Sequence, residues 1–113
     1  MTDPTTPAAE LRAAAKLVGE RAAAARQDMT DNPFWHCYDP ASAWRDGLVN
    51  GFGGPSSEYA ALMHPGVGEP LAAWLEAVAR EMRFTDGTEY QHVEFDSWKG
   101  ALAVARALLG TAR

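Results

Sequence analysis

The stretch EYAALMHPGVGEP, residues 58–70, separates two apolar runs of helical spacing and decides how the chain turns. Tyr59 to Met63 suit a short helix that Ser56 or Ser57 can cap. Pro65 disfavours helical backbone at His64, so this short helix should end there. Pro65 also has the φ that the first position of a new helix requires. The stretch therefore predicts a helix, a corner and a second helix.

The start of that second helix is complicated by another proline. Apolar residues recur at helical spacing from Val67 to Met82. In a helix that began at Pro65, Pro70 would remove a hydrogen bond and clash with the carbonyl of Gly66. We therefore predict that the regular part of the helix begins near Glu69.

The first part of the chain predicts a tail over residues 1–6 and a long helix over residues 7–28. Thr6 can cap this helix, and Pro7 suits its first position. Small and apolar side chains form a heptad-like stripe along it: Leu11, Ala15, Val18, Ala22, Ala25 and Met29. These six are interface candidates, because two alanine-rich helices can approach closely. Packing of the stripe inside one chain is a slightly better interpretation than a homodimer.

Residues 30–56 are aromatic and glycine-rich, and they predict an irregular segment. Phe34 to Tyr38 could form a short strand. DPASAWRDG, residues 39–47, has the pattern of a short helix with Asp39 as its cap and Gly47 just past its end. The glycines and Pro55 that follow argue against regular structure.

Residues 57–110 predict a helical core that ends in a clear helix. The Asp-Gly signal within residues 83–95 fits a small hairpin or a plain loop. The final helix, which Asp96 or Ser97 could cap and Gly110 could end, should bury one face: Trp98, Ala101, Leu102, Ala105, Leu108 and Leu109. The expected fold is thus mainly α, a single domain over residues 1–113.

Composition restricts the classes of function. The 113 residues carry a net charge of −5 and a single cysteine, which excludes an internal disulfide. No basic run supplies a surface for nucleic acid or for an anionic membrane. No apolar stretch reaches bilayer length, and the start lacks the features of a signal peptide. We expect a cytoplasmic protein.

Four residues are weak candidates for a metal site: His36, Cys37, His64 and His92. Zinc sites usually pair their ligands at a spacing of two to four residues, and no such pair exists here. Cys37 and a histidine could form a nucleophile and its base, but nothing marks an oxyanion hole or a third orienting group. We expect no metal, no cofactor and no enzyme.

Three blocks of sequence resemble a known group of proteins. They are ELRAAAKLVGERAAAA (10–25), EYAALMHPGVGEPLAAWLEAVA (58–79) and ALAVARALLG (101–110). Together they are similar to small proteins of actinobacteria and their phages that share an EYIA-x-MHP helix corner and an ALAVARA C-terminal helix, and distantly to the Ead type of phage accessory protein. NPFWH, residues 32–36, stands where these proteins typically read TPGPW. The resemblance implies a phage- or prophage-related accessory protein, and it supplies no functional residues.

These observations leave three functional hypotheses. The first is a non-enzymatic accessory protein that binds another protein or a second copy of itself. The second is a small-molecule or metal binder that uses the aromatic, histidine and cysteine side chains of residues 34–38. The third and weakest is an acidic modulator of a nucleic-acid-binding protein.

Overall fold

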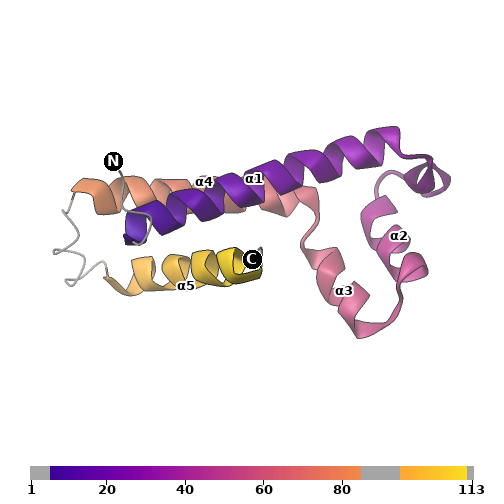
Figure 1. The fold of residues 1–113 in the computed structure, drawn as a ribbon. Helices are drawn as coiled ribbons and strands as arrows, with labels where there is room; N and C mark the ends of the chain where they lie inside the picture. Colours follow the sequence, from indigo (N-terminus) through magenta and orange to yellow (C-terminus); the bar gives the residue numbers. More distant parts are fainter. Residues whose placement is uncertain (1–5, 85–94, 112–113) are drawn as a thin grey trace. The chain divides into compact units, whose positions relative to one another are not determined.

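The computed structural model describes residues 6–84 and 95–111, and it confirms the mainly α fold. Its elements are α1 (Pro7–Asp31), the short 3-10 helix η1 (Pro33–Cys37), α2 (Ala43–Gly51), α3 (Gly54–Leu62), α4 (Pro65–Phe84) and α5 (Phe95–Thr111), as Figure 1 shows. The described residues contain no strand. Most of the expected hairpin or loop at 83–95 lies outside the described residues.

The chain forms two compact units. Unit 1 comprises residues 1–19 and 70–113, and unit 2 comprises residues 20–69. The long helices α1 and α4 contribute residues to both. That the two units act as a single domain stays a prediction.

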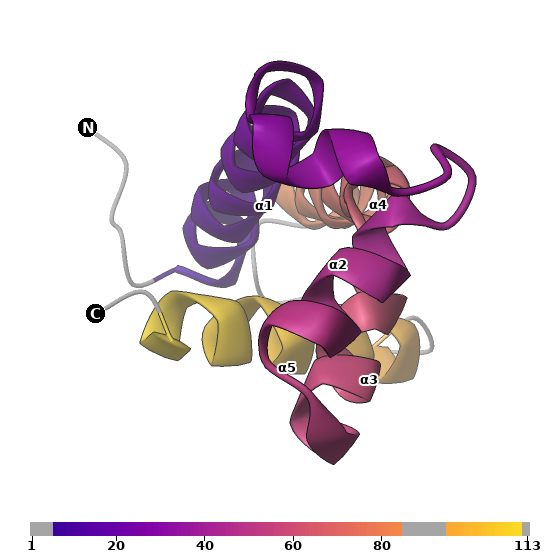
Figure 2. The ribbon, with the colours of Figure 1, turned by 90° about the vertical axis from the view of Figure 1, so that its right-hand side faces the viewer.

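Unit 1 is a three-helix core, and alanines make up half of its buried residues among those that the structure describes (Figures 1 and 2). Leu11 of α1 and Leu75 of α4 are its fully buried large side chains. Small residues let the helices approach closely, and a Cβ added to Gly19 would meet the Ala72 Cβ at 3.8 Å. The predicted apolar face of α5 is confirmed: its members are buried or pack against the core, which consists of Leu11, Ala14, Ala15, Leu75, Val78, Ala79, Met82, Trp98, Ala101 and Ala105.

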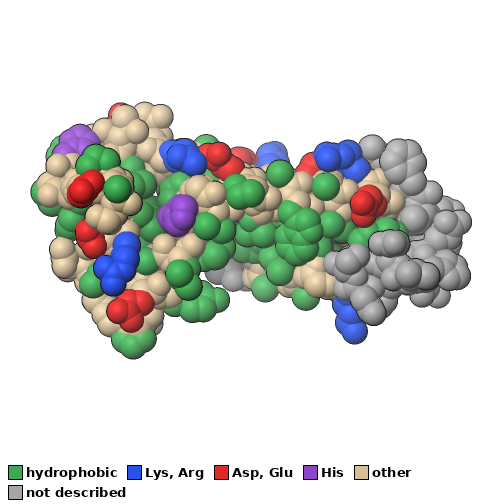
Figure 3. All heavy atoms as spheres, turned by 180° about the vertical axis from the view of Figure 1, so that it is seen from behind, with side chains coloured by type: hydrophobic (Ala, Val, Ile, Leu, Met, Phe, Trp, Pro, Cys, Tyr) green, Lys and Arg blue, Asp and Glu red, His purple; other side chains and the backbone are tan. Residues whose placement is uncertain are grey.

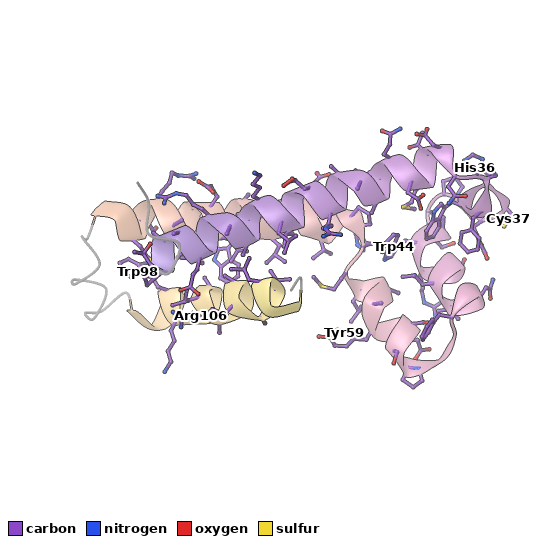
Figure 4. The ribbon with its side chains drawn as sticks, in the orientation of Figure 1. His36, Cys37, Trp44, Tyr59, Trp98 and Arg106 are labelled. Carbon is purple, nitrogen blue, oxygen red and sulfur yellow. The ribbon has the colours of Figure 1, made fainter. Side chains whose placement is uncertain are left out.

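Polar side chains connect the helices of unit 1 at the edge of this core. The Trp98 Nε1–H donates to Glu81 Oε2 at 3.0 Å, which satisfies an indole that is otherwise buried. Arg106 donates from Nε and from Nη2 to the two carboxylate oxygens of Glu10, each at 3.0 Å (Figure 4). This bidentate pair joins α5 to α1.

The start of α1 is confirmed, and its end lies farther along than predicted. The Ala9 N–H donates to Thr6 Oγ1 at 3.2 Å, so Thr6 caps the helix. The helix continues from residue 28 to Asp31, and the Thr30 hydroxyl donates to the Arg26 carbonyl at 3.2 Å within this extra turn. Asn32 ends it, since its side chain instead accepts the Phe34 N–H at 3.0 Å and caps η1.

The prediction of an irregular segment over residues 30–56 was wrong. Residues 33–37 form a 3-10 helix rather than a strand, because Pro33 and the Asn32 cap favour a helical turn. Asp39 caps only a turn, accepting the Ala41 N–H at 3.0 Å, so α2 begins at Ala43. The helix α2 also passes through Gly47, the predicted end.

Two glycines in an unusual backbone conformation make the corner between α2 and α3. Gly53 and Gly54 have φ values of 84° and 79°, a region that side chains with a Cβ rarely adopt. This corner lets α3 begin at Gly54, earlier than the predicted cap at Ser56 or Ser57. Ser57 lies inside the helix, and its hydroxyl donates to the Gly53 carbonyl at 3.0 Å.

The corner at His64-Pro65 is confirmed, but the predicted start near Glu69 was wrong. The helix α4 begins at Pro65 and contains Pro70. His64 Nδ1 accepts the Gly66 N–H at 3.1 Å, and the His64 carbonyl accepts the Val67 N–H at 2.8 Å. These two hydrogen bonds cap the first turn and fix its helical backbone before Pro70. Pro70 lacks an N–H and so loses one hydrogen bond, but this loss does not end the helix.

The ends of α5 also differ from the prediction. The helix begins at Phe95, before the expected caps, and continues through Gly110 to Thr111. Glycine is a weak helix breaker when the backbone can continue. None of the described helices combines the length and apolarity that crossing a membrane requires.

The core assignment predicts a large cost for Leu75→Ala. Removing this fully buried side chain should lower the free energy of unfolding by about 2–5 kcal/mol, because a cavity replaces it. Leu62→Ala is the matched control: Leu62 is 71% exposed, and its loss should change stability by less than about 0.5 kcal/mol. Urea unfolding followed by circular dichroism measures both. Equal costs would contradict the assignment of the core.

Candidate functional site

Unit 2 contains a cluster of four aromatic rings, which we call the aromatic cluster: Phe34, Trp35, Tyr38 and Trp44. Trp35 of η1 and Trp44 of α2 stack with ring centroids 5.4 Å apart and an angle of 9°. Phe34 meets Trp35 edge to face, with centroids 5.1 Å apart. Such pairs add stability beyond the area they bury, so the cluster ties η1 to α2.

Trp35 is the buried centre of this cluster, and two neighbours position it. Its Nε1–H donates to Asp28 Oδ2 at 2.8 Å. Its six-membered ring lies so close to Gly47 that a Cβ there would be only 2.6 Å from Cζ3. Sequence analysis interpreted Gly47 as a helix end and missed this contact. Trp35 and Gly47 lie twelve residues apart in different elements, and no local rule identifies such a contact.

The histidines and the cysteine take structural positions in the described residues. The His36 Nε2–H donates to the Thr30 carbonyl at 2.9 Å, and the exposed Cys37 thiol donates to the Phe34 carbonyl at 3.5 Å (Figure 4). His64 caps α4. His92 lies outside the described residues. Over residues 6–84 and 95–111, no three histidine, cysteine or acidic side chains gather in a way that could hold a metal ion.

The stripe of interface candidates on α1 divides between buried and half-buried positions. Leu11, Ala15 and Ala22 are buried inside the chain, which supports intramolecular packing for these three. Val18, Ala25 and Met29 are half-buried. A role for them at an interface stays a prediction.

A cavity of about 320 Å³ opens beside the aromatic cluster, entirely within unit 2. Sequence analysis did not predict it, because it forms between side chains of α1, α2 and the corner that joins α3 to α4. Its described lining combines three basic side chains with apolar ones and holds no carboxylate: Arg26, Met29, Pro40, Ala41, Ser42, Trp44, Arg45, Ala61, His64, Pro65 and Gly66. Trp44 projects from α2 toward it (Figure 4).

The helix α3 exposes large apolar side chains along one face. Tyr59, Leu62 and Met63 are 75%, 71% and 48% exposed. Tyr59 and Leu62 lie three residues apart on the same side of the helix, and Met63 is the C-cap that follows it; we call these three residues the α3 face. Phe52, just before the corner, is 81% exposed. Sequence analysis placed the three residues on a short helix but assigned them no role.

Charge is mixed over the visible surface. On the face in Figure 3, basic and acidic side chains are interspersed rather than gathered into one patch. Arg26 pairs with Glu69, and Arg45 lies 3.4 Å from Asp46. A surface of this kind does not attract a phosphate backbone strongly.

Comparison with known proteins gives no relative. No protein-family model, no curated protein and no solved structure matches the chain.

The contact between Trp35 and Gly47 predicts that Gly47→Ala destabilises the protein. The new methyl group must push Trp35 aside, which should cost about 1–3 kcal/mol of unfolding free energy although alanine favours helix. Gly100→Ala is the control, since its Cβ would meet nothing within 4 Å and should stabilise α5 by about 0.5–1 kcal/mol. Thermal and urea unfolding measure both variants. Stabilisation by Gly47→Ala would show that the close contact is absent.

Proposed function

We propose that this protein is a small non-enzymatic accessory protein that acts by binding another protein through the α3 face. The observation that carries the proposal is the exposure of Tyr59 and Leu62 on one side of α3 and of Met63 at its C-cap. Contiguous exposed apolar side chains of this kind mark interaction surfaces in soluble proteins. Each large side chain that a partner covered fully would contribute about 1.5–3 kcal/mol.

The arrangement of α3 favours an outward role for these side chains. Its inner positions are small: Ser57 is buried, and Ala61 lines the cavity. Large residues would normally occupy the inner side of an amphipathic helix, and here they occupy the outer side. The α3 face therefore does not contribute to the core of unit 2, which leaves it for a partner.

The sequence resemblance supports the wider setting of this proposal. The block over residues 58–79 that resembles the phage and actinobacterial proteins contains the whole α3 face and the corner between α3 and α4. A phage- or prophage-type role in the cytoplasm, with a protein partner or a second copy of the chain, is consistent with this placement. The net charge of −5 gives little support to direct binding of nucleic acid.

The proposal predicts that Leu62→Glu abolishes association. Light scattering after size exclusion shows whether the wild-type chain forms a dimer, and affinity capture from a host lysate shows which proteins bind it. A charge in the centre of an apolar contact should reduce either association more than tenfold, because it must lose its hydration there. The control is Ala23→Glu, which adds the same charge at an exposed position of α1.

Two results would contradict the proposal. One is a wild-type monomer that captures no protein. The other is association that Leu62→Glu and Ala23→Glu leave equally intact. Circular dichroism of both variants verifies that the helices persist.

A further inference from the structure

The cavity of unit 2 is the second feature of this fold that suggests binding, and it is distinct from the α3 face. Its volume of about 320 Å³ lies at the lower end of the range for small-molecule sites. Such sites are mostly apolar and contain a few polar groups that fix the orientation of the ligand. The lining of this cavity has that composition.

The polar groups of the lining are donors. The Arg45 side chain is 63% exposed, and its only acidic partner among the described residues is the adjacent Asp46 at 3.4 Å, a weak contact. Arg26 pairs with Glu69, yet neither Asp46 nor Glu69 lines the cavity. His64 Nδ1 accepts the Gly66 N–H, which leaves Nε2 as the ring nitrogen that can donate to a ligand. An anionic acceptor would complement these groups.

Trp44 gives the cavity an aromatic wall that a second ring holds in place. One side of its indole stacks on Trp35, and the residue also lines the cavity. Its Nε1–H is buried and has no hydrogen-bond partner among the described residues. A buried donor without an acceptor is costly and rare in folded proteins. Because protein atoms cover this nitrogen, a ligand in the cavity would contact the ring of Trp44 rather than its N–H.

The apolar part of the lining favours a flat body on the ligand. Met29, Pro40 and Pro65 lie in the lining with Trp44, and Ala61 keeps the α3 side open because its side chain is small. Flat rings fit such walls and lose little entropy when they bind.

We propose that this cavity binds a small organic carboxylate with a planar apolar body. The carboxylate lies against Arg45, with His64 as a further donor, and the planar body packs among Trp44, Met29 and the prolines. Binding here is independent of the protein partner, because the α3 face lies outside the lining.

The test is a titration of the ¹⁵N-labelled full chain with three probes. Benzoate carries both the ring and the charge, benzamide carries the ring alone, and acetate carries the charge alone. The indole N–H signals in the NMR spectrum report on each tryptophan, and Trp44→Phe identifies the signal of Trp44. We expect benzoate to shift the Trp44 signal saturably and to leave the Trp98 signal of unit 1 unchanged. Benzamide and acetate should each bind at least about fivefold more weakly.

Variants of Arg45 separate binding from folding. Arg45→Gln should weaken benzoate at least about fivefold, because it removes a charge-assisted hydrogen bond. Arg21→Gln, an exposed change on α1 outside the lining, should have no effect. Well-dispersed spectra of both variants establish that they fold.

Three outcomes would overturn the proposal. They are no saturable shift of the Trp44 signal up to the solubility limit of benzoate, equal affinity for all three probes, and unchanged affinity in Arg45→Gln. Leu62→Glu tests only the α3 face, and the benzoate titration tests only the cavity, so the two proposals can fail separately. Loss of association in Leu62→Glu with unchanged benzoate binding would support both.

Discussion

The close approach of Trp35 to Gly47 is the contact on which the arrangement of unit 2 depends. No side chain with a Cβ fits at Gly47 while the indole stays where it is, because the two would be 2.6 Å apart. With glycine there, the indole lies close against α2, stacks on Trp44 and donates its N–H to Asp28. Because Gly47 has no Cβ, the Trp35 ring of η1 contacts both α1 and α2. The same ring stacks on Trp44, which lines the cavity.

Unit 1 depends on a related constraint, because half of the buried residues in its described core are alanines. Ala14, Ala79, Ala101 and Ala105 bring three helix backbones close together, but each buries little apolar area. Leu11, Leu75 and Trp98 therefore carry much of the hydrophobic stabilisation, and the pair of Arg106 with Glu10 adds a polar tie at the edge. A core of this kind is sensitive to the loss of any one large side chain.

Helical periodicity was sufficient to predict most of the fold, and it failed where tertiary contacts outweigh local signals. The apolar faces of α4 and α5 follow from the spacing of apolar residues. The Thr6 cap follows from its residue type and from the proline after it. Gly47 and Pro70 misled the prediction because each is locally unfavourable in a helix, whereas a tryptophan contact and a capped first turn compensate for it. The cavity and the exposure of the α3 face both depend on which side of α3 packs against the rest of unit 2. The sequence of α3 alone does not determine that side.

The cavity and the α3 face have one structural cause. A helix whose inner positions are Ser57 and Ala61 cannot fill the space beside α2, so a cavity remains there, lined by Trp44 and Arg45. The same register places Tyr59, Leu62 and Met63 outward. An ordinary soluble helix would reverse this pattern, gain core stability and lose both features. Unit 2 is therefore less stable than it would be with large side chains on the inner side of α3. This arrangement is consistent with an α3 that serves binding rather than packing.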